Sequence, residues 1–159
     1  MSWFSNRAQE WVVPQVLLLA RPGSEIVLVS PWIDSVRLRP PLYDLPPNRD
    51  AANYRLAELL RDLAVQADIR VTLVVRERDY RFERATNYLA KSKPSHFKCY
   101  EDATLHAKAI VTEKFVVHGS ANLLERSIHY NAELCMMDAN LHSSARSWVR
   151  SYMGLSVSI

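Results

Sequence analysis

Short apolar segments typical of β-strands alternate along this chain with segments of helical periodicity. Residues 25–30 form a nearly continuous apolar run, which is typical of a central, fully buried strand. Residues 69–75 form a second such run, and between the two the leucines from Leu56 to Leu63 recur at helical spacing. This alternation predicts an α/β fold with a mixed central β-sheet flanked by helices on both faces.

Hydrophobic periodicity and turn residues predict the remaining elements in the same way. Further helices are expected over residues 5–20, 51–66, 80–92 and 141–152, with a kink at Pro14 in the first. Further strands are expected over residues 97–100, 105–112, 115–117 and 130–138. The proline-rich residues 34–50 form a long loop, which is either shaped for function or disordered.

Length and composition indicate an ordinary globular protein. The 159 residues fit a single domain over residues 1–159, with its core at about 24–153. The formal charge of +3 and the pI near 9.0 permit a polyanionic partner without establishing one. Cys99 and Cys135 lack metal or redox spacing, so we expect reduced thiols and a cytoplasmic protein. Residues 11–20 are apolar but too short to span a bilayer; a core-covering helix is expected, with an amphipathic membrane anchor as the alternative.

Five residues between positions 106 and 133 carry the chemical groups needed to attack a phosphodiester without a metal. His106 can attack phosphorus directly. Lys108 and Asn122 can hold the non-bridging oxygens, and Ser120 can add a hydrogen bond. Glu133 can fix the tautomer of the imidazole. We find no pair of residues with metal-ligand spacing, and the mechanism needs neither a metal nor a cofactor.

The expected hairpin would bring these groups together. Alternate residues of a strand share a face, so His106 and Lys108 should project together from a strand over residues 105–112. Gly119 should end the next strand and let the backbone approach a ligand closely. Taken singly, each residue has an ordinary structural interpretation, such as a core histidine or a turn former. A buried lysine beside that histidine is harder to explain structurally.

These residues resemble the signature of the phospholipase D superfamily, His-x-Lys-x4-Asp followed by Gly-Ser-x-Asn and a distal Asn-x-Glu. The likeness extends from residue 25 to residue 138, because residues 25–33 are similar to the family's first core strand. The family's aspartate is Glu113 here, a position that is chiefly structural in the family. Most members carry two motifs and this chain carries one, because His96-Phe-Lys98 has no Gly-Ser-x-Asn at the right distance.

The resemblance implies a site shared by two protomers. The two-step reaction needs a nucleophile and a general acid, and one motif supplies one histidine. The chain is similar in size to single-motif endonucleases of the Nuc type, which work as twofold dimers. By that likeness, His106 forms a phosphohistidine and the partner's His106 protonates the leaving oxygen.

A basic segment with interleaved aromatic residues lies upstream of the motif. It is either a solvated helix face or a strip that binds nucleic acid phosphates. Its candidate nucleic-acid-binding residues are Arg76, Arg78, Arg81, Arg84, Lys91 and Lys93.

The sequence therefore predicts a metal-independent phosphodiesterase, foremost a nuclease that acts as a homodimer on nucleic acid, with DNA favoured over RNA as the substrate. Two alternatives stay open. One is a phospholipase D-type lipid phosphodiesterase or transferase. The other is an inactive nucleic-acid-binding module of a defence or restriction system.

Overall fold

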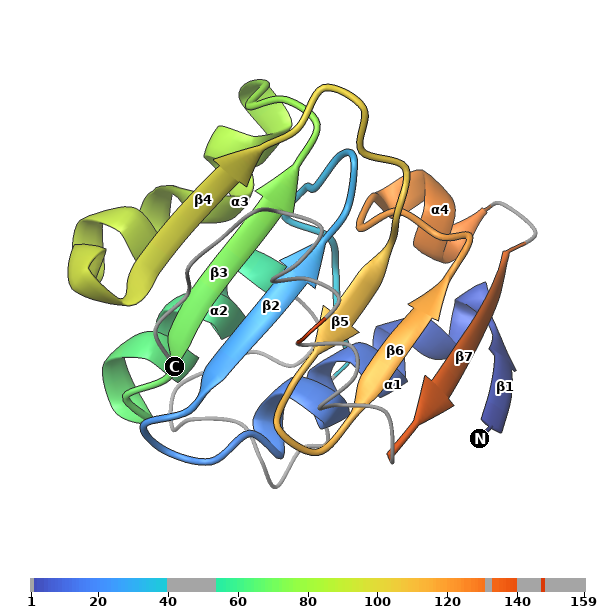
Figure 1. Cartoon of the computed structure of the whole chain (residues 1–159), viewed down its shortest axis with the longest axis horizontal. Helices are drawn as coiled ribbons and strands as arrows, with labels where there is room; N and C mark the ends of the chain where they lie inside the picture. Colours follow the sequence, from blue (N-terminus) through green and yellow to red (C-terminus); the bar gives the residue numbers. More distant parts are fainter. Residues whose placement is uncertain (1, 40–53, 131–132, 140–146, 148–159) are drawn as a thin grey trace.

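The computed structural model describes residues 2–39, 54–130, 133–139 and 147. Within them, seven strands form one mixed sheet in the order β1-β7-β6-β5-β2-β3-β4 (Figure 1). Strands β2, β3 and β4 are parallel, and every other neighbouring pair is antiparallel. The strands are β1 (Ser2–Ser5), β2 (Glu25–Val29), β3 (Arg70–Val75), β4 (Phe97–Glu101), β5 (Ala109–Val111), β6 (Val116–Gly119) and β7 (Leu134–Asp138).

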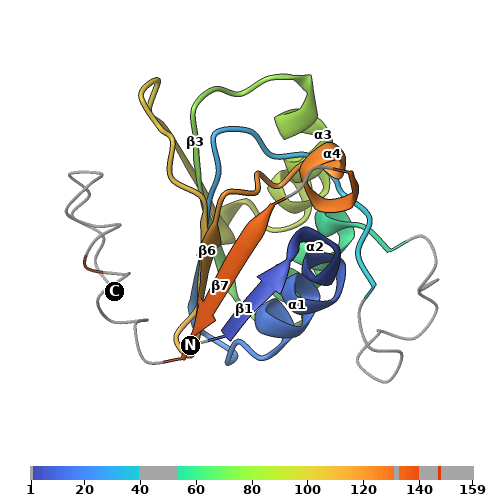
Figure 2. The same cartoon turned by 90° about the vertical axis from the view of Figure 1, so that its right-hand side faces the viewer.

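The described α-helices all lie on one face of the sheet, as the side view shows (Figure 2). They are α1 (Asn6–Leu18), α2 (Leu56–Gln66), α3 (Tyr80–Ser92) and α4 (Glu125–His129). The helix expected over residues 141–152 lies outside the described residues except for Ser147. In the described part of the chain, no helix is long and apolar enough to cross a membrane.

Both faces of the sheet bury apolar side chains. In β2, Ile26 and Leu28 belong to the core under the helices, whereas Val27 and Val29 belong to a second buried cluster. Strands β3, β5 and β6 alternate in the same way. Because successive side chains of a strand point to opposite faces, the second cluster lies on the other side of the sheet. This confirms the prediction of a mixed α/β sheet with buried central strands.

The structure departs from the predicted elements in two situations. In one, a strand pairs with a segment distant in sequence; in the other, a helix is too short to show a periodic pattern. Strand β1 occupies Ser2–Ser5, where no strand was expected, and it ends where the predicted helix over residues 5–20 was to begin. Its partner β7 is distant in sequence, so no local pattern marks it. Helix α4 has five residues, too few to show a periodicity. In the expected loop, Val36 and Leu38 are fully buried, and residues 40–50 lie outside the described residues.

Helix α3 has the predicted bounds, and its start is fixed by a side-chain cap. The carboxylate of Asp79 accepts hydrogen bonds from the backbone N–H groups of Arg81 at 2.9 Å and Phe82 at 3.1 Å. Burial by itself raises the pKa of Asp79, but the hydrogen bonds from the Arg81 guanidinium and from these two amides outweigh it. They hold the pKa below its ordinary value of 3.8.

We expect Asp79→Ala to lower the free energy of unfolding at pH 7 by about 1 kcal/mol, the usual contribution of an N-cap. Because the folded-state pKa is lowered, this stabilisation is present above pH 3.8 and is lost as the pH falls through the folded-state value. Urea unfolding of both proteins at several pH values measures it. Asp79→Asn, which keeps a capping oxygen, should retain most of the stability at pH 7. Equal losses in the two variants would show that the cap contributes little.

Candidate active site

The five motif residues come together at one edge of the sheet. Ala109 of β5 pairs with Val29 at the end of β2, so the segment before β5 lies at the carboxyl ends of the parallel strands. The end of β6 lies beside it, because His118 pairs with Ala109. Strand β7 begins at the same edge, because Gly119 pairs with Cys135. His106, Lys108, Ser120, Asn122 and Glu133 therefore occupy three neighbouring segments at the edge where ligands of open α/β sheets bind.

His106 and Lys108 precede the strand that was expected to carry them. The prediction of a strand over residues 105–112 was wrong at its start, because β5 begins at Ala109. The His106 side chain is exposed and Lys108 is half-buried. Instead of projecting from a pleated strand, the Lys108 ammonium turns back and donates a hydrogen bond to the His106 carbonyl at 2.6 Å. His106 and Lys108 therefore lie in a loop before β5, and the contact between them is this side-chain to backbone hydrogen bond.

Ser120 and Glu133 contact each other directly. The Ser120 hydroxyl donates a hydrogen bond to Glu133 Oε2 at 2.5 Å and accepts one from the Leu134 N–H at 3.2 Å. These bonds connect the loop after β6 to the start of β7. The structure thus places the Glu133 carboxylate beside Ser120, and its role as the orienter of His106 stays a prediction.

Asn122 lines a groove of about 630 Å³ together with Trp32, Glu77, Arg81 and residues at the start of α4. Its Oδ1 is buried and has no hydrogen-bond partner within the described structure. An amide N–H can donate a hydrogen bond to a phosphate oxygen. Trp32 was missed as a site residue, although its position three residues after the end of a buried parallel strand is a usable signal.

Glu113, at the family's aspartate position, has a structural contact. It lies in the turn between β5 and β6, where its Oε1 accepts a hydrogen bond from the Arg21 N–H at 2.7 Å. This turn is at the other end of β5 from His106. The hydrogen bond therefore attaches the hairpin to the chain after α1, away from the motif.

Gly119 is required by the sheet itself. A Cβ at this position would lie 2.3 Å from the Leu134 carbonyl oxygen and 2.8 Å from the Cys135 Cα. We expected this glycine to admit a ligand, but the group that approaches it is the backbone of β7.

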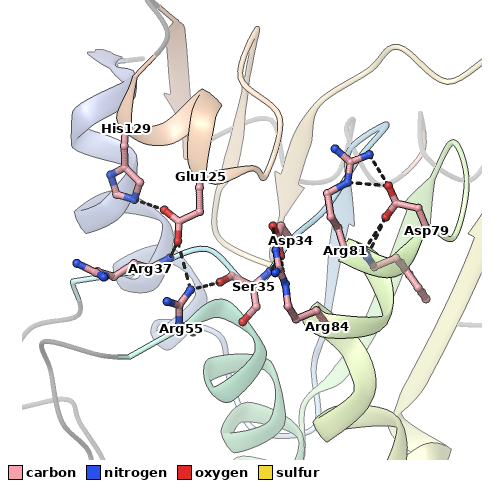
Figure 3. A network of polar contacts seen from close by, with 10 residues as sticks. Asp34, Ser35, Arg37, Arg55, Asp79, Arg81, Arg84, Glu125 and His129 are labelled. Atoms are coloured by element: carbon pink, nitrogen blue, oxygen red, sulfur yellow. Dashed lines mark hydrogen bonds and ion pairs between the residues drawn. The ribbon is translucent and has the colours of Figure 1, made fainter.

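Most of the basic segment is neutralised by carboxylates. Figure 3 shows the Asp79–Arg81 and Asp34–Arg84 pairs, and each arginine has its pKa raised chiefly by the hydrogen bond that it donates to its carboxylate partner. The same figure shows Glu125 paired with Arg55 and His129. The remaining pairs are Arg78 with Glu101 and Lys93 with Asp68, while Lys91 is exposed. This pairing weakens the interpretation of the whole segment as a phosphate-binding strip.

Arg76 differs from these residues. Among the described residues it makes no ion pair, and its guanidinium contacts the Leu105 carbonyl and the His106 ring. Within the same described part, His, Cys, Asp and Glu side chains form no cluster of three that could hold a metal ion.

Comparison with known proteins agrees with this geometry. A family model described as "Cardiolipin synthase, PLD-like domain" matches residues 45–150, more than half of the chain. The chain belongs to the phospholipase D-like family. It therefore has the phosphodiesterase fold of that superfamily, as the signature residues predicted. No curated protein matches the chain.

Solved structures show the same fold at low sequence identity. The phospholipase D family member Nuc from Salmonella typhimurium is 19% identical, with a TM-score of 0.62 over 90% of this chain and 83% of that one. NucT from Helicobacter pylori is 15% identical, with a TM-score of 0.58 over 94% and 92% of the two chains. An archaeal chromatin protein with a novel mode of DNA binding is 12% identical, with a TM-score of 0.60 over 95% and 51%.

Proposed function

We propose that this chain is a metal-independent phosphodiesterase, a nuclease that cleaves DNA or RNA through a phosphohistidine in a site shared by two protomers. The observation that carries the proposal is the placement of His106, Lys108, Ser120, Asn122 and Glu133 at one sheet edge. Likeness in fold to Nuc and NucT supports a nuclease, and likeness to a DNA-binding chromatin protein supports a nucleic acid as the partner.

In the first step, a ring nitrogen of His106 attacks the phosphorus and the bond to the leaving oxygen breaks. The partner's His106 gives its proton to that oxygen, so the product leaves as an alcohol. Lys108 and Asn122 hold the equatorial oxygens, where negative charge lies in the transition state. His106 is exposed, which leaves its ring open to an incoming phosphodiester.

In the second step, the partner's His106 takes a proton from water and the resulting hydroxide attacks phosphorus. The phosphorus–nitrogen bond breaks and His106 is regenerated, so protons and bonds balance over the cycle. Glu133 accepts the Ser120 hydrogen bond at 2.5 Å, and this contact holds the carboxylate at the site edge, where it can orient the imidazole.

We expect hydrolysis to persist in excess EDTA, because the proposed nucleophile and cations are side chains of the protein. Labelled single- and double-stranded DNA and RNA, and a nitrophenyl diester, are incubated with purified protein in EDTA and in magnesium. Activity that disappears with the chelator and returns with magnesium would exclude the mechanism.

The same assay distinguishes the lipid alternative, which the description of the matching family favours. Hydrolysis of anionic phospholipid in vesicles, with no cleavage of any oligonucleotide, would replace the nuclease proposal. Oligonucleotide binding that weakens as salt rises, accompanied by cleavage, supports the nuclease.

A further inference from the structure

We propose that Arg76 is a positioning residue for His106, an inference that rests on the proposed function. Arg76 directly follows β3, at the carboxyl ends of the parallel strands. Its backbone N–H donates a hydrogen bond to the Pro31 carbonyl at 3.0 Å, which fixes it to the segment after β2. The arginine therefore extends toward the motif from the rigid centre of the sheet.

The guanidinium holds the backbone beside the nucleophile. Its Nε and Nη2 both donate to the Leu105 carbonyl oxygen, at 3.2 and 2.7 Å. Leu105 is fully buried and precedes His106 in the chain. The planar fork of an arginine fixes a carbonyl in direction as well as in distance, which a lysine cannot do.

The same nitrogen also contacts the imidazole. Nη2 lies 3.1 Å from His106 Nδ1 and 3.2 Å from Nε2. A point nearly equidistant from both ring nitrogens at this range lies over the face of the ring, because in the ring plane it would collide with ring carbons. The lone pair used for nucleophilic attack lies in the ring plane. Arg76 thus supports the ring from its face and leaves the attacking direction open.

Trp32 holds the guanidinium in place. The Arg76 Cζ lies 4.9 Å from the centre of the Trp32 ring, within the range of a cation–π contact. The indole is itself fixed by a hydrogen bond from its Nε1 to Glu77 at 3.1 Å. Among the described residues, the guanidinium contacts a carbonyl, an imidazole and an indole, and none of these groups carries a negative charge. A positive charge therefore remains beside the atom that receives the phosphate.

The test is a comparison of kcat and KM for diester hydrolysis in three variants. Arg76→Ala should lower kcat by about 100-fold, the scale of a small displacement of a catalytic group, with KM and oligonucleotide affinity essentially unchanged. Arg76→Lys should lose less, and added guanidinium should restore part of the kcat of Arg76→Ala. The matched control is Arg70→Ala, which removes an exposed arginine at the opposite end of β3 and should leave both constants unchanged.

Two results would overturn the proposal. A raised KM with unchanged kcat would make Arg76 an ordinary phosphate-binding residue, and unchanged constants would remove it from the site.

NMR separates this proposal from the proposed function. In protein labelled at histidine, the Cε1–Hε1 signal of His106 should move in Arg76→Ala and stay in Arg70→Ala. The signal of His96 should stay in Arg76→Ala, because His96 lies beside Arg70 and away from Arg76. If wild-type protein hydrolyses no diester, the proposed function fails, and a shifted His106 signal still supports the Arg76 contact. An unmoved His106 signal rejects the inference whether or not the protein is active.

Discussion

Replacing His106 by alanine is expected to abolish phosphodiester cleavage, with a loss of kcat on the order of 10⁶, the scale seen when a catalytic nucleophile is removed. The reason is that His106 is the proposed nucleophile, so the variant has lost the group on which the covalent intermediate forms. Nucleic-acid binding should persist, because phosphate affinity is spread over many cations. Single-turnover cleavage and equilibrium binding of the same labelled oligonucleotide measure the two effects separately.

The chain offers a matched control for this variant. His96 stands two residues before Lys98, so it has the same spacing as the motif, but it lies before β4 and contacts Asp68 at 2.7 Å. His96→Ala should keep wild-type activity. Full activity in His106→Ala, or loss of activity in His96→Ala alone, would show that the site has been assigned to the wrong histidine.

Mixing His106→Ala with wild-type protomers is expected to silence the wild-type partner. One motif supplies one histidine, whereas the proposed reaction uses two at one phosphorus. A mixed dimer lacks either the nucleophile or the acid, so activity should follow the square of the wild-type fraction. Co-expression at several ratios, with the two chains carrying different tags, gives the mixed dimers, and light scattering gives their mass.

Two outcomes contradict the shared site. One is an active species with the mass of a monomer. The other is activity that falls in simple proportion to the wild-type fraction, which would mean that each protomer works alone.

Much of the fold could be predicted from local patterns. Strand β2 and helix α3 agree with their predicted positions, since a continuous apolar run and a capped, periodic segment are properties of consecutive residues. The strand β1 could not be found in this way, because its pairing partner β7 lies at the far end of the chain.

The candidate site was predictable in its members and not in its contacts. The identities of the motif residues are properties of the sequence. The contact of Ser120 with Glu133, which forms where β6 ends and β7 begins, was not predicted. The turn of Lys108 toward the His106 carbonyl depends on where β5 begins. The contact of Arg76 with His106 joins residues 30 positions apart, which no local pattern encodes.

Gly119 approaches β7 so closely that a Cβ at this position would prevent the two strands from pairing as they do. Only glycine fits opposite the Leu134 carbonyl, so the observed register of β6 and β7 requires glycine at position 119. A slip of one residue would turn every side chain of β7 to the opposite face and carry Glu133 away from Ser120. Correct pairing of β6 with β7 therefore also brings Ser120 and Glu133 into contact. Substitutions here should act on the yield of competent protein more than on the rate of each competent molecule.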